Sequence, residues 1–260
     1  MDEQLHHLEV GAGAAARPIA VRTQAGGSPG VFWLGGFKSD MRGTKAEALA
    51  AYAATSGRAL VRFDYSGHGE SGGPFEEGTI SRWRNEALAV FEAFARGPQV
   101  VVGSSMGGWI ALLLARELAL RPAAEARIAG MVLIAPAADF TEELMWPALS
   151  PEAKQAIVEK GMWERPSAYG DGPYPITRAL IEDGRNHLIL GAPLEIGCPV
   201  RILQGVQDPD VPWRHAVKLA ALLPQADVVL TLVPDGDHRL SRAEDIERLL
   251  RAVDELANTP

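Results

Sequence analysis

The sequence is short of cysteine, of positive charge and of long apolar runs. Its single cysteine, Cys198, excludes an intramolecular disulfide, and its place at the start of an apolar segment predicts a packed thiol rather than a nucleophile. The 33 acidic side chains outnumber the 25 basic ones, for a formal charge of −8. This balance argues against nucleic acid as a partner, because its binding needs clustered lysine and arginine. No window reaches the roughly 18 apolar residues expected of a membrane span.

The N-terminal residues also have no recognisable targeting signal. Residues 1–4 are Met, Asp, Glu and Gln, and no apolar core of a signal peptide follows them. We therefore expect a cytoplasmic protein. With 260 residues and a hydrophobic content of 47%, the chain is long and apolar enough for one α/β domain with an insertion.

Short apolar segments alternate with amphipathic ones along most of the chain. Strands are predicted at residues 31–34, 59–63, 99–102, 131–134, 199–205 and 228–233, after a short polar and apolar lead at 17–23. Helices are predicted near 45–55 and 80–96, directly after 107, and at 242–256. This alternation indicates a largely parallel sheet with helices on both faces.

The alternation breaks between Asp139 and Gly197. This stretch of about 58 residues contains six prolines and lacks clear strand signals, and connections of such length are usually functional. We predict a single domain over residues 1–260, with a helical cap inserted at about 139–197.

The segment Gly103-Ser104-Ser105-Met106-Gly107 matches the pattern G-x-S-x-G. It follows the predicted strand at 99–102 and opens a helix-like stretch, and this order is typical of the nucleophile elbow of serine hydrolases. The turn is so sharp that its flanking positions must be nearly free of side chains, which glycine alone allows. Ser105 is therefore the candidate nucleophile. Ser104 has no correctly spaced glycine pair, and a plain Gly/Ser loop is the simpler alternative.

A serine hydroxyl needs a base to take its proton and a carboxylate to orient that base. His238 follows the last predicted strand and precedes the last predicted helix, so it is the candidate base; a solvated loop histidine is the alternative. The other histidines lie in a polar N-terminal segment, a Gly-rich loop, the middle of the chain and a helix-like stretch: His6, His7, His68, His187 and His215.

The acid should follow an earlier strand, because the chain order in these hydrolases is Ser, then Asp or Glu, then His. Asp208 lies in the loop after the strand at 199–205 and is the candidate acid, with Asp210 as the neighbour to exclude. Asp139, after the strand at 131–134, is a rival position. For Asp64 we expect a structural role, with its carboxylate bonded to amides of its own turn.

These residues resemble the alpha/beta-hydrolase superfamily over nearly the whole chain. Within it the chain is similar to the mitochondrial acyl-protein thioesterases of the alpha/beta-hydrolase-domain group, also known as acyl-glucuronide esterases. The matching stretches are residues 62–67, 102–109, 163–167, 198–201, 208–213 and 237–239. The resemblance implies the same nucleophile, acid and base, and it departs in the lack of a presequence like that of the mitochondrial relatives.

In this fold the loop after the first parallel strand supplies an oxyanion donor. That loop here is Leu34-Gly35-Gly36-Phe37, so the expected donors are the amides of Phe37 and Met106. Turn formation alone would also explain the two glycines.

Methionine and aromatic side chains collect in the predicted cap and would suit a flexible apolar acyl group. The candidates for substrate binding are Trp146, Met162 and Trp163, although packing of the cap onto the core would explain any one of them. The full set is Met145, Trp146, Leu149, Met162, Trp163, Tyr169, Tyr174 and Leu180.

Together these features predict a serine hydrolase that cleaves carboxylic esters or thioesters through an acyl-enzyme, with no metal or organic cofactor. The substrate would be a small molecule or an acylated protein, with acyl chains longer than acetyl preferred. The alternatives are a peptidase or carbon–carbon bond hydrolase with the same three residues, and a non-catalytic binding protein on this fold.

Overall fold

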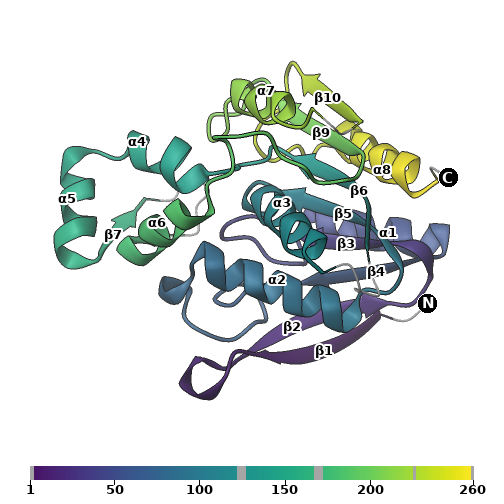
Figure 1. The fold of residues 1–260 in the computed structure, drawn as a ribbon, viewed down its shortest axis with the longest axis horizontal. Helices are drawn as coiled ribbons and strands as arrows, with labels where there is room; N and C mark the ends of the chain where they lie inside the picture. The colour runs from purple at the N-terminus through teal and green to yellow at the C-terminus, as the bar shows by residue number, and fades with distance from the viewer. Residues whose placement is uncertain (1–2, 122–126, 167–171, 225–226, 259–260) are drawn as a thin grey trace.

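The computed structural model describes residues 3–121, 127–166, 172–224 and 227–258. An eight-stranded sheet forms its centre, in the order β1-β2-β4-β3-β5-β6-β9-β10 (Figure 1). Its strands are β1 (Glu3–Val10), β2 (Arg17–Gln24), β3 (Gly27–Leu34), β4 (Arg58–Phe63), β5 (Pro98–Ser104), β6 (Arg127–Ile134), β9 (Val200–Gly205) and β10 (Val228–Val233).

The six strands from β4 to β10 run parallel, and β1 and β2 are antiparallel additions at one edge. β5 lies between β3 and β6, with Val102 opposite both Trp33 and Val132. Strands covered on both faces have apolar residues at every position rather than at alternate ones, and Val100, Val101 and Val102 are all fully buried. The predicted, largely parallel sheet is therefore confirmed.

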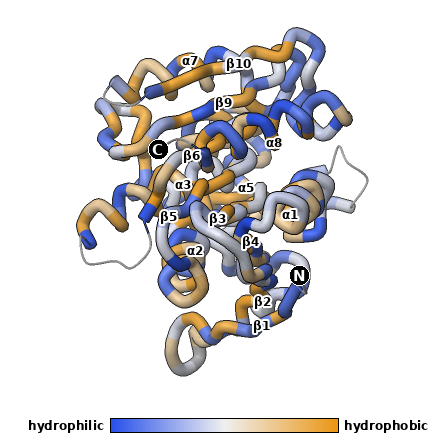
Figure 2. The backbone as a smooth tube through the Cα atoms, turned by 90° about the vertical axis from the view of Figure 1, so that its right-hand side faces the viewer, coloured by the Kyte–Doolittle hydropathy of each residue, from blue (hydrophilic) through white to orange (hydrophobic). Residues whose placement is uncertain are grey.

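Helices cover both faces of the sheet. α1 (Thr44–Ser56) and α8 (Ala243–Ala257) share one apolar layer, and α2 (Ile80–Phe94), α3 (Met106–Ala119) and α7 (Trp213–Ala221) share the other. Figure 2 shows α1 and α2 on opposite sides of β3 and β4. Among the described residues, none of the helices combines the length and apolar character that a membrane span requires.

β1 is a strand that the sequence analysis did not predict, because its residues are mostly polar. It pairs along its whole length with β2, from Glu3 opposite Gln24 to Val10 opposite Arg17. As an edge strand it needs few apolar residues, and most of its side chains are exposed or half-buried.

The chain between β6 and β9, here called the β6–β9 segment, contains both helices and strands. It projects to one side of the sheet, on the left in Figure 1. Its elements are a π-helical turn (Thr141–Met145), α4 (Trp146–Ala148), α5 (Pro151–Lys160), β7 (Met162–Arg165), β8 (Tyr174–Thr177), α6 (Arg178–Gly184) and a 3₁₀ turn (Arg185–His187).

The two short strands of this segment are an addition to the helical cap that we predicted. β7 and β8 form an antiparallel pair, with Met162 opposite Thr177 and Arg165 opposite Tyr174. Each strand has only four residues, and Pro175 lies within β8. Proline is tolerated here because a two-stranded pair consists of edge strands only.

Candidate active site

Ser105 lies on the sharp turn between β5 and α3, in a conformation that few side chains adopt. Its φ is +54°, in the left-handed region, which is unfavourable for any residue with a Cβ. A Cβ on Gly103 would lie 2.4 Å from the carbonyl oxygen of Gly107, and one on Gly107 would lie 2.1 Å from that of Leu34. The backbone can therefore follow this path only with glycine at both positions.

The structure brings Ser105, His238 and Asp208 together in one hydrogen-bonded chain. His238 Nε2 lies 3.1 Å from Ser105 Oγ, and His238 Nδ1 lies 2.8 Å from Asp208 Oδ2. Because β9 and β10 are parallel neighbours, the loops that follow them, which hold Asp208 and His238, meet at the same edge of the sheet. The topology of the sheet thus brings together residues that are far apart in the sequence: Asp208 lies 103 residues after Ser105, and His238 lies 30 residues after Asp208.

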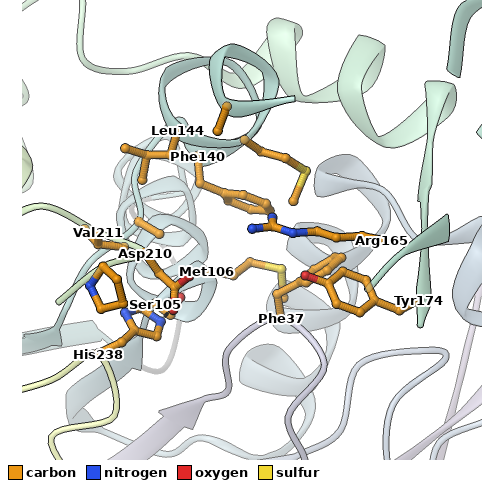
Figure 3. Close-up of a pocket in the computed structure, with 14 residues that line it drawn as sticks. Phe37, Ser105, Met106, Phe140, Leu144, Arg165, Tyr174, Asp210, Val211 and His238 are labelled. Carbon is orange, nitrogen blue, oxygen red and sulfur yellow. Dashed lines mark hydrogen bonds between the residues drawn. The ribbon is translucent and has the colours of Figure 1, made fainter. Parts of the chain in front are cut away.

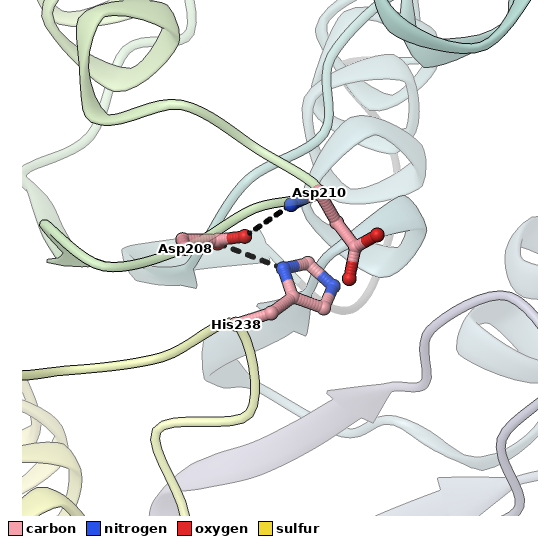
Figure 4. A group of neighbouring side chains, drawn as sticks. All are labelled: Asp208, Asp210 and His238. Carbon is pink, nitrogen blue, oxygen red and sulfur yellow. Dashed lines mark hydrogen bonds and ion pairs between the residues drawn. The ribbon is translucent and has the colours of Figure 1, made fainter. Parts of the chain in front are cut away.

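The Asp208 carboxylate is fully buried and held from several sides. Its Oδ1 accepts a hydrogen bond from the backbone N–H of Asp210 at 2.8 Å (Figure 4). The same oxygen accepts a second one from the backbone N–H of Val211, also at 2.8 Å. Its Oδ2 accepts one from Gln204 Nε2 at 3.2 Å, in addition to the contact with His238. This orients one carboxylate oxygen toward the imidazole.

The rival acids have other contacts. Asp139 accepts hydrogen bonds from the N–H groups of Ile189 and Leu190, so it ties the end of the β6–β9 segment to the loop after β6. Asp64 accepts from Glu70 N–H at 2.8 Å, within its own loop as expected, and also from Met41 N–H at 2.6 Å. Burial raises the pKa of both carboxyl groups above the usual range.

Four of the other histidines form hydrogen bonds away from Ser105. His6 Nε2 lies 2.9 Å from Thr23 Oγ1, and His187 Nε2 lies 2.6 Å from Ser81 Oγ. His215 Nε2 donates to the carbonyl of Ala138 at 2.7 Å, and His68 accepts from a backbone amide. Ser104 is buried at the end of β5.

Asp208, Asp210 and His238 are also the donor set that could hold a metal ion. One ligand atom of each lies within 4.8 Å of the others (Figure 4). Carboxylate oxygen and imidazole nitrogen are common ligands of divalent cations. A cation there would compete with the hydrogen bond between His238 Nδ1 and Asp208 Oδ2.

Residues 35–39 contain the expected oxyanion donor Phe37, are here called the oxyanion loop, and lie against Ser105. A Cβ on Gly36 would lie 3.4 Å from both the Cβ of Ser105 and the carbonyl oxygen of Ser104. Met106 is the first residue of α3, and its N–H belongs to the helix end that has no intrahelical acceptor. In the part of the chain that the structure describes, the amides of Phe37 and Met106 donate to no other group.

A cavity of about 230 Å³ opens above Ser105 and His238 (Figure 3). Most of its wall is apolar. Its polar residues are Ser105, His238 and Asp210 at one end and Arg165 and Tyr174 on the far side. Its apolar lining consists of Phe37, Met106, Ala137, Phe140, Leu144, Met145, Ala148, Pro209 and Val211. Figure 3 shows the guanidinium of Arg165 and the phenol of Tyr174 directed into this space.

Trp146, Met162 and Trp163, our candidates for substrate binding, are not among the residues that line this cavity. The ring of Trp146 lies beneath the guanidinium of Arg185, 5.5 Å from the ring centroid, and Trp163 packs against the main core. Met162 is 37% exposed. The π-helical turn instead contributes Leu144 and Met145, and such turns recur at functional sites.

The remaining aromatic and apolar residues of the predicted cap lie in different places. Tyr174 lines the cavity as expected, whereas Leu149 and Leu180 are buried in the core. Tyr169 and Ser167 lie outside the described residues.

A second cavity, of about 260 Å³, adjoins Ser105 and has more charged residues in its lining. These are three cationic side chains, Lys38, Lys45 and Arg239, and one carboxylate, Asp40. Burial lowers the pKa of Lys45 to about 8. Trp33 also lines this cavity; its indole N–H is buried and has no hydrogen-bond partner in the described part of the chain.

Comparison with known proteins gives consistent matches over nearly all of the chain. The model of the alpha/beta hydrolase family matches residues 25–252. A Bos taurus protein named mitochondrial palmitoyl-protein thioesterase ABHD10 is 37% identical over 239 residues, which are 92% of this chain and 76% of the relative.

Two solved structures are similar in fold and in sequence. One is an Agrobacterium vitis S4 protein that is described as a hydrolase, with no substrate named. It is 49% identical in sequence, with a TM-score of 0.97, over 99% of this chain and all of the other. The second is mouse alpha/beta hydrolase domain-containing protein 10, 34% identical with a TM-score of 0.84, over 97% of this chain and 98% of the other.

These relatives contradict the cytoplasmic location that we expected. The matching proteins of cattle, orangutan, human, mouse and rat are all named as mitochondrial. The expectation rested on the residues at the start of the chain, and those residues do not decide the location.

Proposed function

Because this chain belongs to the alpha/beta hydrolase family, we propose that it is a serine hydrolase of carboxylic esters or thioesters that acts through Ser105, His238 and Asp208. The observation that carries the proposal is the pair of hydrogen bonds at His238, whose Nε2 accepts from the Ser105 hydroxyl and whose Nδ1–H donates to Asp208. The thioesterase name of relatives more than a third identical supports the bond type.

The reaction would begin when His238 Nε2 takes the proton of Ser105 as its oxygen attacks the acyl carbonyl. Asp208 stabilises the imidazolium and fixes its tautomer. The oxyanion accepts hydrogen bonds from the amides of Phe37 and Met106, and each such donor typically contributes about 3 kcal/mol of transition-state stabilisation. His238 then protonates the departing thiolate or alkoxide. Water activated by the same imidazole hydrolyses the acyl-enzyme and restores Ser105.

We propose that the β6–β9 segment, over about residues 139–197, is a cap inserted into a single domain and forms the far wall of the acyl site. The apolar cavity next to Ser105 supports acyl chains longer than acetyl. Each additional buried CH₂ contributes about 0.8 kcal/mol until the space is filled, so kcat/KM should rise with chain length up to that limit.

The leaving group would occupy the second cavity. Its three cationic side chains, which outnumber the single carboxylate of Asp40, favour a leaving group with oxygen acceptors or negative charge. This lining supports an acyl ester of a bulky polar alcohol, such as a glucuronide, as a second candidate beside an S-acylated protein.

The first experiment labels the purified protein with a fluorophosphonate, which reacts with activated serines. The native protein should be labelled and the Ser105→Ala variant should not; labelling that persists in the variant would mean that the nucleophile lies elsewhere. A native protein that is not labelled at all would favour the non-catalytic binding protein.

A second experiment identifies the bond and the acyl preference. A panel of short esters, thioesters and aminoacyl anilides distinguishes an esterase from a peptidase, and inactivity on all esters would favour the peptidase or carbon–carbon hydrolase. Within 4-nitrophenyl esters we expect kcat/KM to rise from acetyl to at least octanoyl. Ala148→Phe should shorten the preferred chain because Ala148 lines the cavity, whereas Trp163→Phe, outside it, should not. A maximum at acetyl in the native protein would contradict the long-acyl preference.

A further inference from the structure

Hydrogen bonds hold both peptide groups that meet at the Cα of Phe37. The carbonyl oxygen of Gly36 accepts one from the backbone N–H of Ser39 at 3.2 Å and one from its hydroxyl at 2.8 Å. On the other side, the N–H of Lys38 donates to His68 Nε2 at 3.1 Å. A trans peptide is planar, so the N–H of Phe37 points opposite to the carbonyl of Gly36. Fixing these two groups therefore fixes the direction of the Phe37 N–H.

His68 accepts this hydrogen bond as a neutral imidazole. It is buried on the loop after β4, and its Nδ1 lies 3.0 Å from the carbonyl oxygen of Ser66. A carbonyl only accepts, so Nδ1 holds the ring proton and Nε2 keeps its lone pair for Lys38 N–H. Three aromatic rings contact the imidazole: Tyr65, Phe75 and Trp83. Burial among them lowers the pKa of His68 to about 4, so the ring stays neutral at physiological pH.

The oxyanion loop needs such support because its own backbone does not favour this path. Lys38 has a φ of +61°, a left-handed conformation that costs a non-glycine residue roughly 1–2 kcal/mol. A Cβ on the neighbouring Gly36 would lie only 3.4 Å from the Cβ of Ser105, so the loop passes close to this serine. A small rotation at Phe37 would therefore change where its N–H points relative to Ser105.

We propose that His68 and Ser39 are positioning residues that direct the Phe37 N–H at the oxyanion formed when Ser105 attacks. The inference rests on the proposed function, since it requires an acyl carbonyl at this site. Both residues act through the peptide groups of Phe37, so their loss should lower the rate of acyl transfer more than the affinity for the ground-state substrate.

The test compares His68→Phe, which fills the site but removes the acceptor, with His68→Gln, whose side-chain oxygen can accept from Lys38 N–H. We expect His68→Phe to lower kcat by about 10- to 100-fold, part of the loss that follows removal of an oxyanion donor, with little change in KM. His68→Gln should recover most of kcat. The affinity of an alkylboronic acid, which forms a tetrahedral adduct with the serine, should fall in parallel with kcat/KM.

Ser39→Ala keeps the test valid if His68→Phe does not fold, because Ser39 is exposed. It should lower kcat by roughly 3- to 10-fold, since the loss of one neutral hydrogen bond of about 1 kcal/mol corresponds to that range. Ser39→Thr should retain the native rate. His187→Phe is the matched control: it loses the contact with Ser81 Oγ on the α2 side and should change thermal stability but not kcat.

Two results would overturn the positioning role. One is a folded His68→Phe or Ser39→Ala with native kcat and native boronate affinity. The other is an equal loss in His68→Phe and His68→Gln that follows stability alone. Failure of the proposed function is distinguishable, because then the native protein itself would show neither Ser105 labelling nor ester turnover.

Discussion

At the scale of single residues, the three aspartates near the site differ in their hydrogen bonds. Asp208 contacts the imidazole, Asp210 contacts Asp208 through its backbone N–H, and Asp139 accepts from two backbone amides of the β6–β9 segment. The same Asp→Asn change should therefore have a different result at each.

Asp208→Asn should lower kcat by roughly 10⁴-fold with the fold intact, because the amide favours the wrong imidazole tautomer. Asp210→Asn leaves the backbone bond in place, so we expect a mild effect. Asp139→Asn should cost about 1–3 kcal/mol of stability through its lost backbone partners, with a comparatively mild effect on kcat. Steady-state rates and urea unfolding of the three variants check this. A severe loss of rate confined to Asp139→Asn would mean that the acid follows β6.

His68 should make the folded state sensitive to acid. Its pKa is near 4 in the folded chain and near its ordinary 6.5 in the unfolded one. Between these values the unfolded chain binds a proton that the folded chain does not, so stability falls as the pH drops from about 6.5 to about 4. The loss from this residue is on the order of 3 kcal/mol. Urea unfolding of native protein and His68→Gln across this range should give a flatter curve for the variant, and parallel curves would contradict the assignment.

At the scale of elements, the junction of β3, β5 and α3 depends on the absence of a side chain. Gly107→Ala would place a methyl group 2.1 Å from the carbonyl oxygen of Leu34, which belongs to the backbone of β3 and cannot turn away. We expect a loss of at least about 3 kcal/mol of stability, together with loss of serine labelling, because the elbow must open.

Gly191→Ala is the matched control for this element. Apart from its two chain neighbours, no atom of the described residues lies within 4 Å of the Cβ that it would add, and its backbone is outside the left-handed region. Native melting temperature and labelling are expected for it. If Gly107→Ala behaved in the same way, the close contact between α3 and β3 would not be required.

At the scale of the whole molecule, Cys198 should report on global unfolding. It is buried where the chain leaves the β6–β9 segment and enters β9, and burial raises the pKa of its thiol to about 12. A thiol held this way reacts slowly, because the thiolate is the reactive form. We expect a disulfide reagent to modify the native protein only at its unfolding rate, and Cys198→Ala to retain activity. Rapid modification of folded protein would show that this junction opens locally.

The parallel sheet, the elbow and the expected base and acid follow from local patterns in the sequence. Strands covered on both faces must be apolar at each position, and the turn at Ser105 admits only glycine at its flanks, so both leave a signal within a few residues. The order of His238 and Asp208 after their strands is also a local feature, and parallel strands turn that order into proximity.

Other features depend on segments that are far apart in the sequence, and only the tertiary structure decided them. Which side of the β6–β9 segment faces Ser105 depends on a π-helical turn and a hairpin, so Met145 and Arg165 line the cavity while Trp146 and Trp163 do not. The polar strand β1 is stable only because β2 accepts it at the edge of the sheet. The contact of His68 with Lys38 joins two loops 30 residues apart. The hydropathy pattern of a segment indicates which of its faces packs against the core. It does not indicate which other segment of the chain it contacts.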